Sequence, residues 1–221
     1  MKKFALLLIL LTNFGLMAMA QSKDGSAEEG QLLLADPFIF EEDGWYYIYG
    51  THSNDGIVVY RSQDLKTWSD LCGNAKGGLA LHKDDSWGEK WFWAPEVYKI
   101  GRKYLMTYSA EEHICYAESD SPCGPFVQRE KRPYLPNEKG IDSSFFIDDD
   151  GTPYIFWVRF DGPYGIWMAE LTSDLHALKM ETARLIFEPL PDSWEHVQAH
   201  VSEGPAITKY KGKYYMTYSC N

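Results

Sequence analysis

The stretch that decides the fold is residues 141–175, IDSSFFIDDDGTPYIFWVRFDGPYGIWMAELTSDL. It begins with a short apolar segment that contains one carboxylate, and it turns at Gly151. The aromatic run PYIFWV follows, and the segment GIWMAEL comes after a second turn. Aromatic and β-branched residues favour strands, and glycine readily adopts the positive φ of tight hairpins. The stretch therefore predicts a small antiparallel sheet.

The same order of segments occurs four times along the chain. The other copies are ADPFIFEEDGWYYIYGTHSNDGIVVYRSQDLKTW at 35–68, WAPEVYKIGRKYLMTYSAEEHICYAESDSPCGPF at 93–126 and AHVSEGPAITKYKGKYYMTYSC at 199–220. The turn glycines of the four copies are Gly44, Gly101, Gly151 and Gly212. Four-stranded units of about 40–60 residues are typical of β-propeller blades. A β-sandwich would not repeat one order of segments, so we predict an all-β propeller.

The fourth copy contains only two of these segments before the sequence ends at Asn221. A propeller protects the edges of its blades by closing around an axis. We therefore expect residues 30–221 to be a C-terminally incomplete propeller domain of about three and a half blades. Residues 21–29 form a short segment that precedes it.

The first residues, MKKFALLLILLTNFGLMAMAQS, combine two lysines with an apolar run and with small residues at Ala18 and Ala20. This is the pattern of a secretory signal peptide with an A-x-A cleavage site. The apolar run is shorter than the roughly 18–20 residues that a membrane-spanning helix needs. We expect residues 1–20 to be a signal peptide and the protein to be exported, either to the periplasm or outside the cell.

Charge and cysteine content agree with such an exported protein. The formal net charge is −11, which repels nucleic acid and anionic membrane surfaces, so we expect neither as a partner. A neutral polysaccharide is indifferent to this charge. Disulfides are permitted after export, although the spacing does not decide how the cysteines pair; Cys115 and Cys123 are the closest in sequence. The four cysteines are Cys72, Cys115, Cys123 and Cys220.

Each copy places one residue near the start of its innermost strand, where the strands of a propeller converge on the axis. These residues are Asp36, Ala94, Asp142 and Glu203. Crowding and desolvation raise the pKa of a carboxyl group, so one acid can stay protonated while another activates water. Two carboxyl groups about 6.5–9.5 Å apart suit inverting glycoside hydrolysis. Clustered carboxylates also suit calcium or the capping of loops, and spacing alone leaves both alternatives open.

Four motifs in order carry a resemblance to a known family. They are ADPFIF, FWAPEVYK, GIDSSFFIDDDGTPYIFW and SEGPAITKYKGKYYMTYS. With them the chain resembles glycoside hydrolase family 43, the five-bladed β-propellers that act on arabinose- and xylose-containing plant polysaccharides. The resemblance covers residues 30 to 221.

The resemblance implies a role for each carboxyl group. Asp36 would be the general base that activates water, and Glu203 would be the general acid that protonates the leaving oxygen. Asp142 would adjust the pKa of the acid and orient it. The implied mechanism is a single displacement with inversion. Propellers that act by retention carry NDPNG-like and EC motifs, which differ from the ADPFI and SEGP of this chain.

Four further residues are candidates for binding sugar. Trp93 could stack on a sugar ring, and His52 and His200 could hydrogen-bond to it; the alternatives are packing between blades and ordinary loop positions. Phe145 and Phe146 alternate along a strand, so one is expected to face the cavity, and Phe145 is our candidate.

The sequence therefore predicts an exported glycosidase that cleaves arabinofuranosyl or xylosyl linkages of arabinan, arabinoxylan or xylan. No cofactor is expected to be required, no metal ligands are assigned, and structural calcium is left as an alternative. A carbohydrate-binding propeller with impaired catalysis is the second hypothesis. A purely structural or protein-binding propeller would explain neither the acids nor their positions.

Overall fold

A computed structural model describes residues 32–197 and 201–220. The predicted signal peptide, the segment 21–29 and His200 lie outside these described residues.

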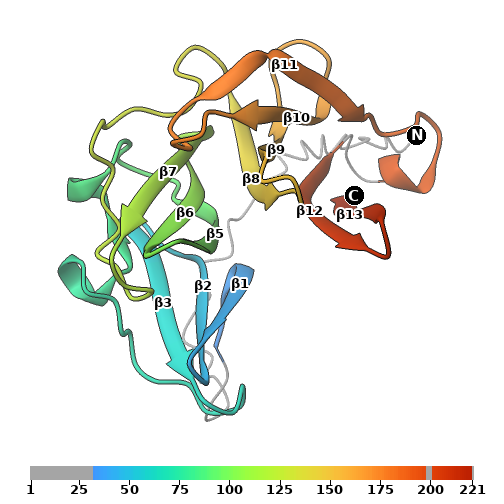
Figure 1. Cartoon of the computed structure of the whole chain (residues 1–221). Coiled ribbons are helices and arrows are strands. Elements are labelled where there is room, and N and C mark those ends of the chain that lie inside the picture. Colours follow the sequence, from blue (N-terminus) through green and yellow to red (C-terminus); the bar gives the residue numbers. More distant parts are fainter. Residues whose placement is uncertain (1–31, 198–200, 221) are drawn as a thin grey trace, which may run out of the picture.

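The described strands form four antiparallel sheets (Figure 1). The first sheet contains β1 (Ala35–Glu42), β2 (Trp45–Ser53), β3 (Gly56–Ser62) and β4 (Leu81–His82); the second contains β5 (Trp93–Ile100), β6 (Lys103–Ala110) and β7 (His113–Ser119). The third contains β8 (Gly140–Ile147), β9 (Pro153–Arg159), β10 (Gly165–Leu171) and β11 (Leu178–Phe187); the fourth contains β12 (Ser202–Tyr210) and β13 (Lys213–Cys220). The helical elements of the described residues are three short 3₁₀ turns, η1 (Lys76–Gly78), η2 (Lys83–Asp85) and η3 (Trp194–His196).

The sheets follow one another in an arc, with β1, β5, β8 and β12 on its inner side (Figure 1). These inner strands contact one another in that order, β1 with β5, β5 with β8 and β8 with β12. Each sheet corresponds to one of the sequence repeats, and the fourth has two strands. The predicted all-β architecture of three blades and the first half of a fourth is confirmed.

Every inner strand begins with an irregularity in its pairing with the next strand. Within it lies one residue with positive φ: Asp36 (49°), Ala94 (45°), Asp142 (54°) and Gly204 (59°). Such bulges re-aim a side chain and end regular pairing. The fourth member is Gly204, one residue after Glu203, so the alignment that equated Glu203 with Asp36 and Asp142 is one residue out of register.

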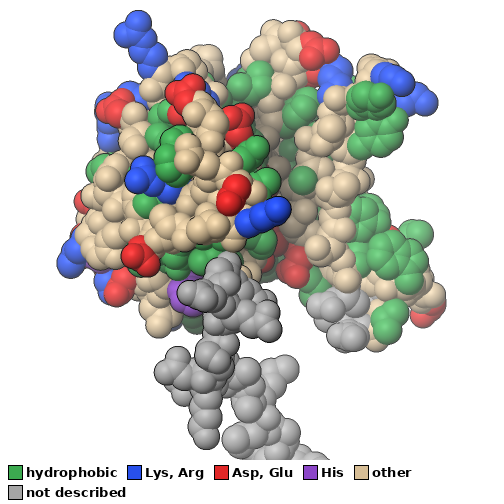
Figure 2. Space-filling model, turned by 90° about the horizontal axis from the view of Figure 1, so that it is seen from below, with side chains coloured by type: hydrophobic (Ala, Val, Ile, Leu, Met, Phe, Trp, Pro, Cys, Tyr) green, Lys and Arg blue, Asp and Glu red, His purple; other side chains and the backbone are tan. Residues whose placement is uncertain are grey.

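Two hydrophobic cores hold neighbouring blades together. One fills the space between the first two sheets and includes Tyr49 and Tyr108, and the other joins the second and third sheets around Trp157. These three side chains are fully buried. No helix among residues 32–197 and 201–220 is long and apolar enough to span a membrane. On the face seen in Figure 2, acidic and basic side chains are interspersed.

The structure also indicates which cysteines lie together. The Sγ atoms of Cys72 and Cys123 are 3.7 Å apart, whereas the buried thiol of Cys115 donates to the carbonyl of His113. Backbone bonds hold both partners, since Cys72 donates to the carbonyl of Val59 and the carbonyl of Cys123 accepts from Asn74. Cys123 therefore faces Cys72 rather than Cys115, its nearest neighbour in sequence.

We expect oxidised glutathione to convert the Cys72 and Cys123 thiols into a disulfide, with two electrons and two protons passing to the oxidant. A hydrogen bond from Cys72 lowers the pKa of Cys123 to about 7 despite burial, which favours the reactive thiolate. The bond would close a loop of about 50 residues and raise the free energy of unfolding by up to about 4 kcal/mol. Mass spectrometry of unreduced peptides and urea unfolding measure both effects. The Cys115→Ala variant is the control, and a Cys115–Cys123 peptide would contradict the prediction.

Candidate active site

A cavity of about 290 Å³ lies where the inner strands of the four sheets meet. It is lined by Asp36, Pro37, Phe38, Ala94, Pro95, Glu96, Asp142, Ser143, Gly204, Pro205 and Ser219. Every sheet contributes, and all four positive-φ residues are among the lining residues. The structure thus brings Asp36 and Asp142 to one cavity, together with the residue that follows Glu203.

A hydroxyl group of one blade holds the start of the inner strand of the following blade. Thr51 Oγ1 donates to Asp36 Oδ2 at 2.7 Å and accepts the N–H of Ala94 at 3.0 Å. In the same way Ser109 Oγ accepts the N–H of Asp142 at 3.0 Å. Thr51 and Ser109 occupy equivalent places, because each pairs with the residue just before the positive-φ residue of its own blade.

The third blade departs from this rule. Its equivalent position is the buried Val158, which pairs with Ile141 and has no hydroxyl group. The N–H of Gly204, which corresponds to the amides of the two earlier blades, donates instead to Asp142 Oδ2 at 3.1 Å. Asp142 therefore takes the place of the missing hydroxyl and holds the backbone immediately after Glu203.

The carboxyl groups influence one another through space. Burial is the main reason that the pKa of Asp142 is raised, and the charges of Glu203 and Asp36 raise it further, to about 7. The bond from Gly204 acts in the opposite direction. The pKa of Glu203 is also raised, first by burial and then by the charge of Asp36. At neutral pH the cavity can therefore hold a proton on a carboxyl group.

Glu96 contributes a third carboxyl group to the lining of the cavity, and the sequence predicted no role for it. Burial raises its pKa to about 8, although hydrogen bonds from Ser144 and Phe145 oppose the shift; the charge of Asp142 adds to it. Simple alternation along the strand does not identify it, because the pairing of β5 with β6 shifts register between Trp93 and Glu96.

The candidate sugar-binding residues lie in different places. Trp93 is half-buried beside Ala94, and its ring stacks on that of Trp91 at 5.7 Å. Trp91 is 43% exposed, and neither ring is among the residues that line the cavity. His52 is exposed on β2 and is absent from the cavity lining. Roles in sugar binding for Trp93 and His52 stay predictions.

The structure corrects the expectation for Phe145. Its side chain is 5% exposed and belongs to the core between the second and third sheets, where it packs edge-on against Tyr98 at 5.1 Å. Phe146 lines a separate apolar cavity between the third and fourth sheets. Neither phenylalanine lines the cavity that contains Asp36 and Asp142, so the expectation that one of them faces it is wrong.

Within residues 32–197 and 201–220, no three His, Cys, Asp or Glu side chains are arranged to hold one metal ion. In that part of the chain the three carboxyl groups therefore do not form a chelating cluster, and the calcium alternative gains no support from them.

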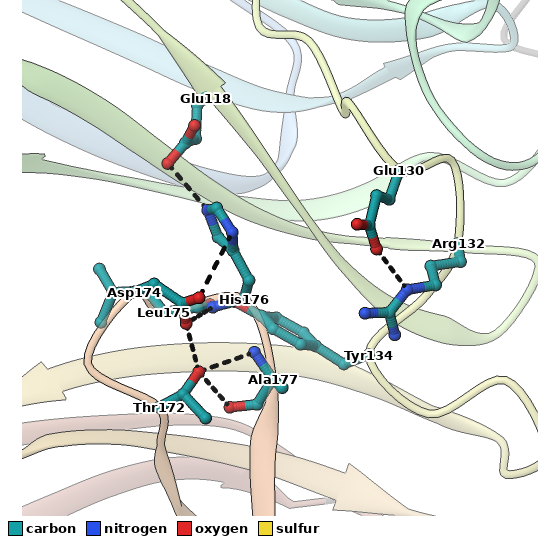
Figure 3. A network of polar contacts seen from close by, with 9 residues as sticks. All are labelled: Glu118, Glu130, Arg132, Tyr134, Thr172, Asp174, Leu175, His176 and Ala177. Carbon is teal, nitrogen blue, oxygen red and sulfur yellow. Dashed lines mark hydrogen bonds and ion pairs between the residues drawn. The ribbon is translucent and has the colours of Figure 1, made fainter.

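A second polar network lies at the outer edge of the blades (Figure 3). The His176 ring stacks on Tyr116 at 5.0 Å, and its Nε2 lies 3.2 Å from Glu118 Oε1. The Tyr134 hydroxyl donates to the carbonyl of Leu175 at 2.7 Å. These bonds join the turn before β11 to β7 and to the segment after it, so the network fastens the third blade to the second.

We expect the Asp142→Asn variant to be more stable than the parent at neutral and alkaline pH. The pKa of an unfolded aspartate is about 3.9, and folding raises that of Asp142 to about 7. The parent therefore loses free energy of unfolding as the pH rises from about 4 to about 7. The advantage of the variant should grow by about 2–4 kcal/mol over this range and then level off. Urea unfolding at pH 4, 6 and 8 measures it, and an advantage independent of pH would contradict the prediction.

Comparison with known proteins identifies the family. The chain matches the sequence profile of Glycosyl hydrolases family 43 over residues 30–221. A solved structure described as an endo-1,4-beta-xylanase from Bacteroides thetaiotaomicron VPI-5482 is similar, with 45% identity and a TM-score of 0.76. The match covers 85% of this chain and 64% of that one.

Two curated relatives are similar at lower identity. A beta-xylosidase of Xylanibacter ruminicola is 27% identical, over 84% of this chain and 71% of the relative. A xylosidase/arabinosidase 43A of Humicola insolens is 26% identical, over 84% and 72%. The chain thus spans about two thirds to three quarters of the length of these proteins. With a profile match that extends from the first strand to the last, and with the fold that its neighbours share, this chain belongs to glycosyl hydrolases family 43.

Proposed function

We propose that the protein is an exported glycoside hydrolase that cleaves xylosyl or arabinofuranosyl linkages of plant polysaccharides by inversion. One observation carries the proposal: Asp36 and Asp142 line one cavity together with Gly204, the residue after Glu203, and the charges of Asp36 and Glu203 help to raise the pKa of Asp142. Such crowding costs stability, and it is the arrangement that acid–base hydrolysis of a glycoside needs.

Asp36 is proposed as the general base. Its Oδ2 accepts a hydrogen bond from Thr51, which is itself fixed by the amide of Ala94. This restricts rotation of the carboxylate and sets the direction in which it can take a proton from water. A water molecule activated in this way would attack the anomeric carbon on the face opposite the leaving group.

Glu203 is proposed as the general acid, since burial and the charge of Asp36 raise its pKa. Asp142 binds the N–H of Gly204, the residue next to Glu203, and so orients the acid through the backbone. Loss of the proton from Glu203 leaves a negative charge near Asp142, whose pKa of about 7 allows it to respond by binding a proton. Their titrations are therefore coupled.

The substrate class is inferred from the relatives and from a pair of stacked aromatic rings. The similar proteins are described as acting on xylan or as xylosidases and arabinosidases. The stacked rings of Trp91 and Trp93 offer an aromatic surface, which suits the C–H faces of a neutral sugar. Export agrees with the signal-like pattern of residues 1–20, because such polymers lie outside the cell.

The test is hydrolysis of xylan, arabinoxylan, arabinan and the aryl xyloside and arabinofuranoside. We expect sugar release by the chain, and a fall in kcat of about 10²–10⁴-fold in Glu203→Gln and in Asp36→Asn, because each removes one proton-transfer group. Glu181→Gln, an exposed position on β11, is the matched control. Proton NMR of the first product should show the inverted anomer.

Other results would change the interpretation. A product with retained configuration would contradict the single displacement. Binding of the oligosaccharides without any hydrolysis would favour a carbohydrate-binding propeller. Unchanged kcat in Glu203→Gln would remove this residue from the mechanism.

A further inference from the structure

Glu96 is a buried carboxyl group in the cavity that the proposed acid–base mechanism does not use. It lies on β5, and its side chain shares the cavity lining with Asp142. Its contacts, however, go to the neighbouring strand β8. These contacts connect Glu96 to the segment that follows Asp142.

Glu96 and Tyr98 together bind the backbone just after Asp142. The Tyr98 hydroxyl donates to Glu96 Oε2, and the N–H of Phe145 donates to the Tyr98 hydroxyl oxygen at 3.0 Å. The side chain of Ser144 is also hydrogen-bonded to Glu96. Both side chains of β5 therefore bind residues 144 and 145 of the next blade.

This segment of β8 needs support. Asp142 has a φ of 54°, and the pairing of β8 with β9 shifts register between Ile141 and Ser144. A non-glycine residue in this conformation costs roughly 1–2 kcal/mol, and it persists only where its surroundings enforce it. Ser109 holds the amide of Asp142, and Thr107 donates to the carbonyl of Ser143 at 3.0 Å.

We propose that Glu96 is a positioning residue of the active site: it completes a row of side chains of the second blade that hold residues 142–145 and so aim the Asp142 carboxylate at Gly204 and Glu203. The inference rests on the proposed function, because it assigns Glu96 a part in the same reaction. Glu96 acts through Asp142 and does not itself exchange protons with the sugar.

The positioning role of Glu96 is limited to the pH range in which its carboxyl group is neutral. With a pKa of about 8, Glu96 is neutral at pH 7. The titratable groups that act on it are Tyr98 on its own strand and Asp142 on β8, and Asp36 lines the same cavity. Ionisation of Glu96 would add a negative charge beside Asp142 and raise the pKa of Asp142 further.

The first test is kinetic. At pH 6 we expect Glu96→Leu to lower kcat about 10–100-fold with KM changed less than threefold, because the substrate site remains while Asp142 moves. The isosteric Glu96→Gln should restore kcat to within about fivefold, and Tyr98→Phe should give an intermediate loss. Glu181→Leu on the exposed face of β11 is the matched control. Unchanged kcat in a folded Glu96→Leu protein would overturn the proposal.

The second test does not depend on activity. Carboxyl-carbon NMR should follow Asp142 through its own titration near pH 7 and through a second step near pH 8, when Glu96 ionises. Glu96→Gln should abolish the second step, and persistence of that step would overturn the proposal. If the parent hydrolyses no substrate, the proposed function is wrong, but the titration still shows whether the ionisation of Glu96 is coupled to that of Asp142. If Glu96→Leu does not fold, Glu96→Gln and Tyr98→Phe supply the result.

Discussion

One residue in the left-handed conformation at the start of each inner strand is the constraint on which the site depends. A regular strand would alternate its side chains between the two faces of the blade and would direct none along the axis. The positive φ of Asp36 and Asp142 interrupts this alternation and directs both carboxyl groups into the same cavity. The conformation is unfavourable for aspartate, so the fold must enforce it from outside the strand.

For Ala94 and Asp142 that enforcement comes from the preceding blade, whereas Asp36 is held by Thr51 of its own blade. Thr51 holds the amide of Ala94, and Ser109 holds that of Asp142. Both hydroxyl groups stand on second strands whose positions are fixed by the cores between blades, where Tyr49 and Tyr108 are fully buried. The apolar packing thus stabilises strands that in turn hold strained, charged residues at the axis.

Much of the fold and of the candidate site could be predicted from the sequence. The repeats predict the blades, and their spacing predicts three carboxyl groups near the axis. The register of Glu203 was missed because the segments between the bulge and the turn glycine differ in length among the copies, although glycine is the residue of SEGP that most readily takes positive φ. The burial of Phe145 was missed for a related reason: alternation predicts that two faces exist, but only packing against Tyr98 decides which face is the core. Glu96 was missed because its role depends on contacts with another blade.

The difference between the blades explains why a carboxylate holds the backbone at the third interface. In the first two, a hydroxyl group of Thr51 or Ser109 binds the amide of the next blade, so no carboxylate is needed for that purpose. Val158 provides no hydroxyl at the third, so the amide of Gly204 binds Asp142 instead. A carboxylate that holds the backbone beside Glu203 both orients that residue and remains close enough for its own pKa to respond to the charge of Glu203. The absence of one hydroxyl from an otherwise repeated pattern thus leaves the amide beside Glu203 to the Asp142 carboxylate, which links these two acidic residues through the backbone as well as through space.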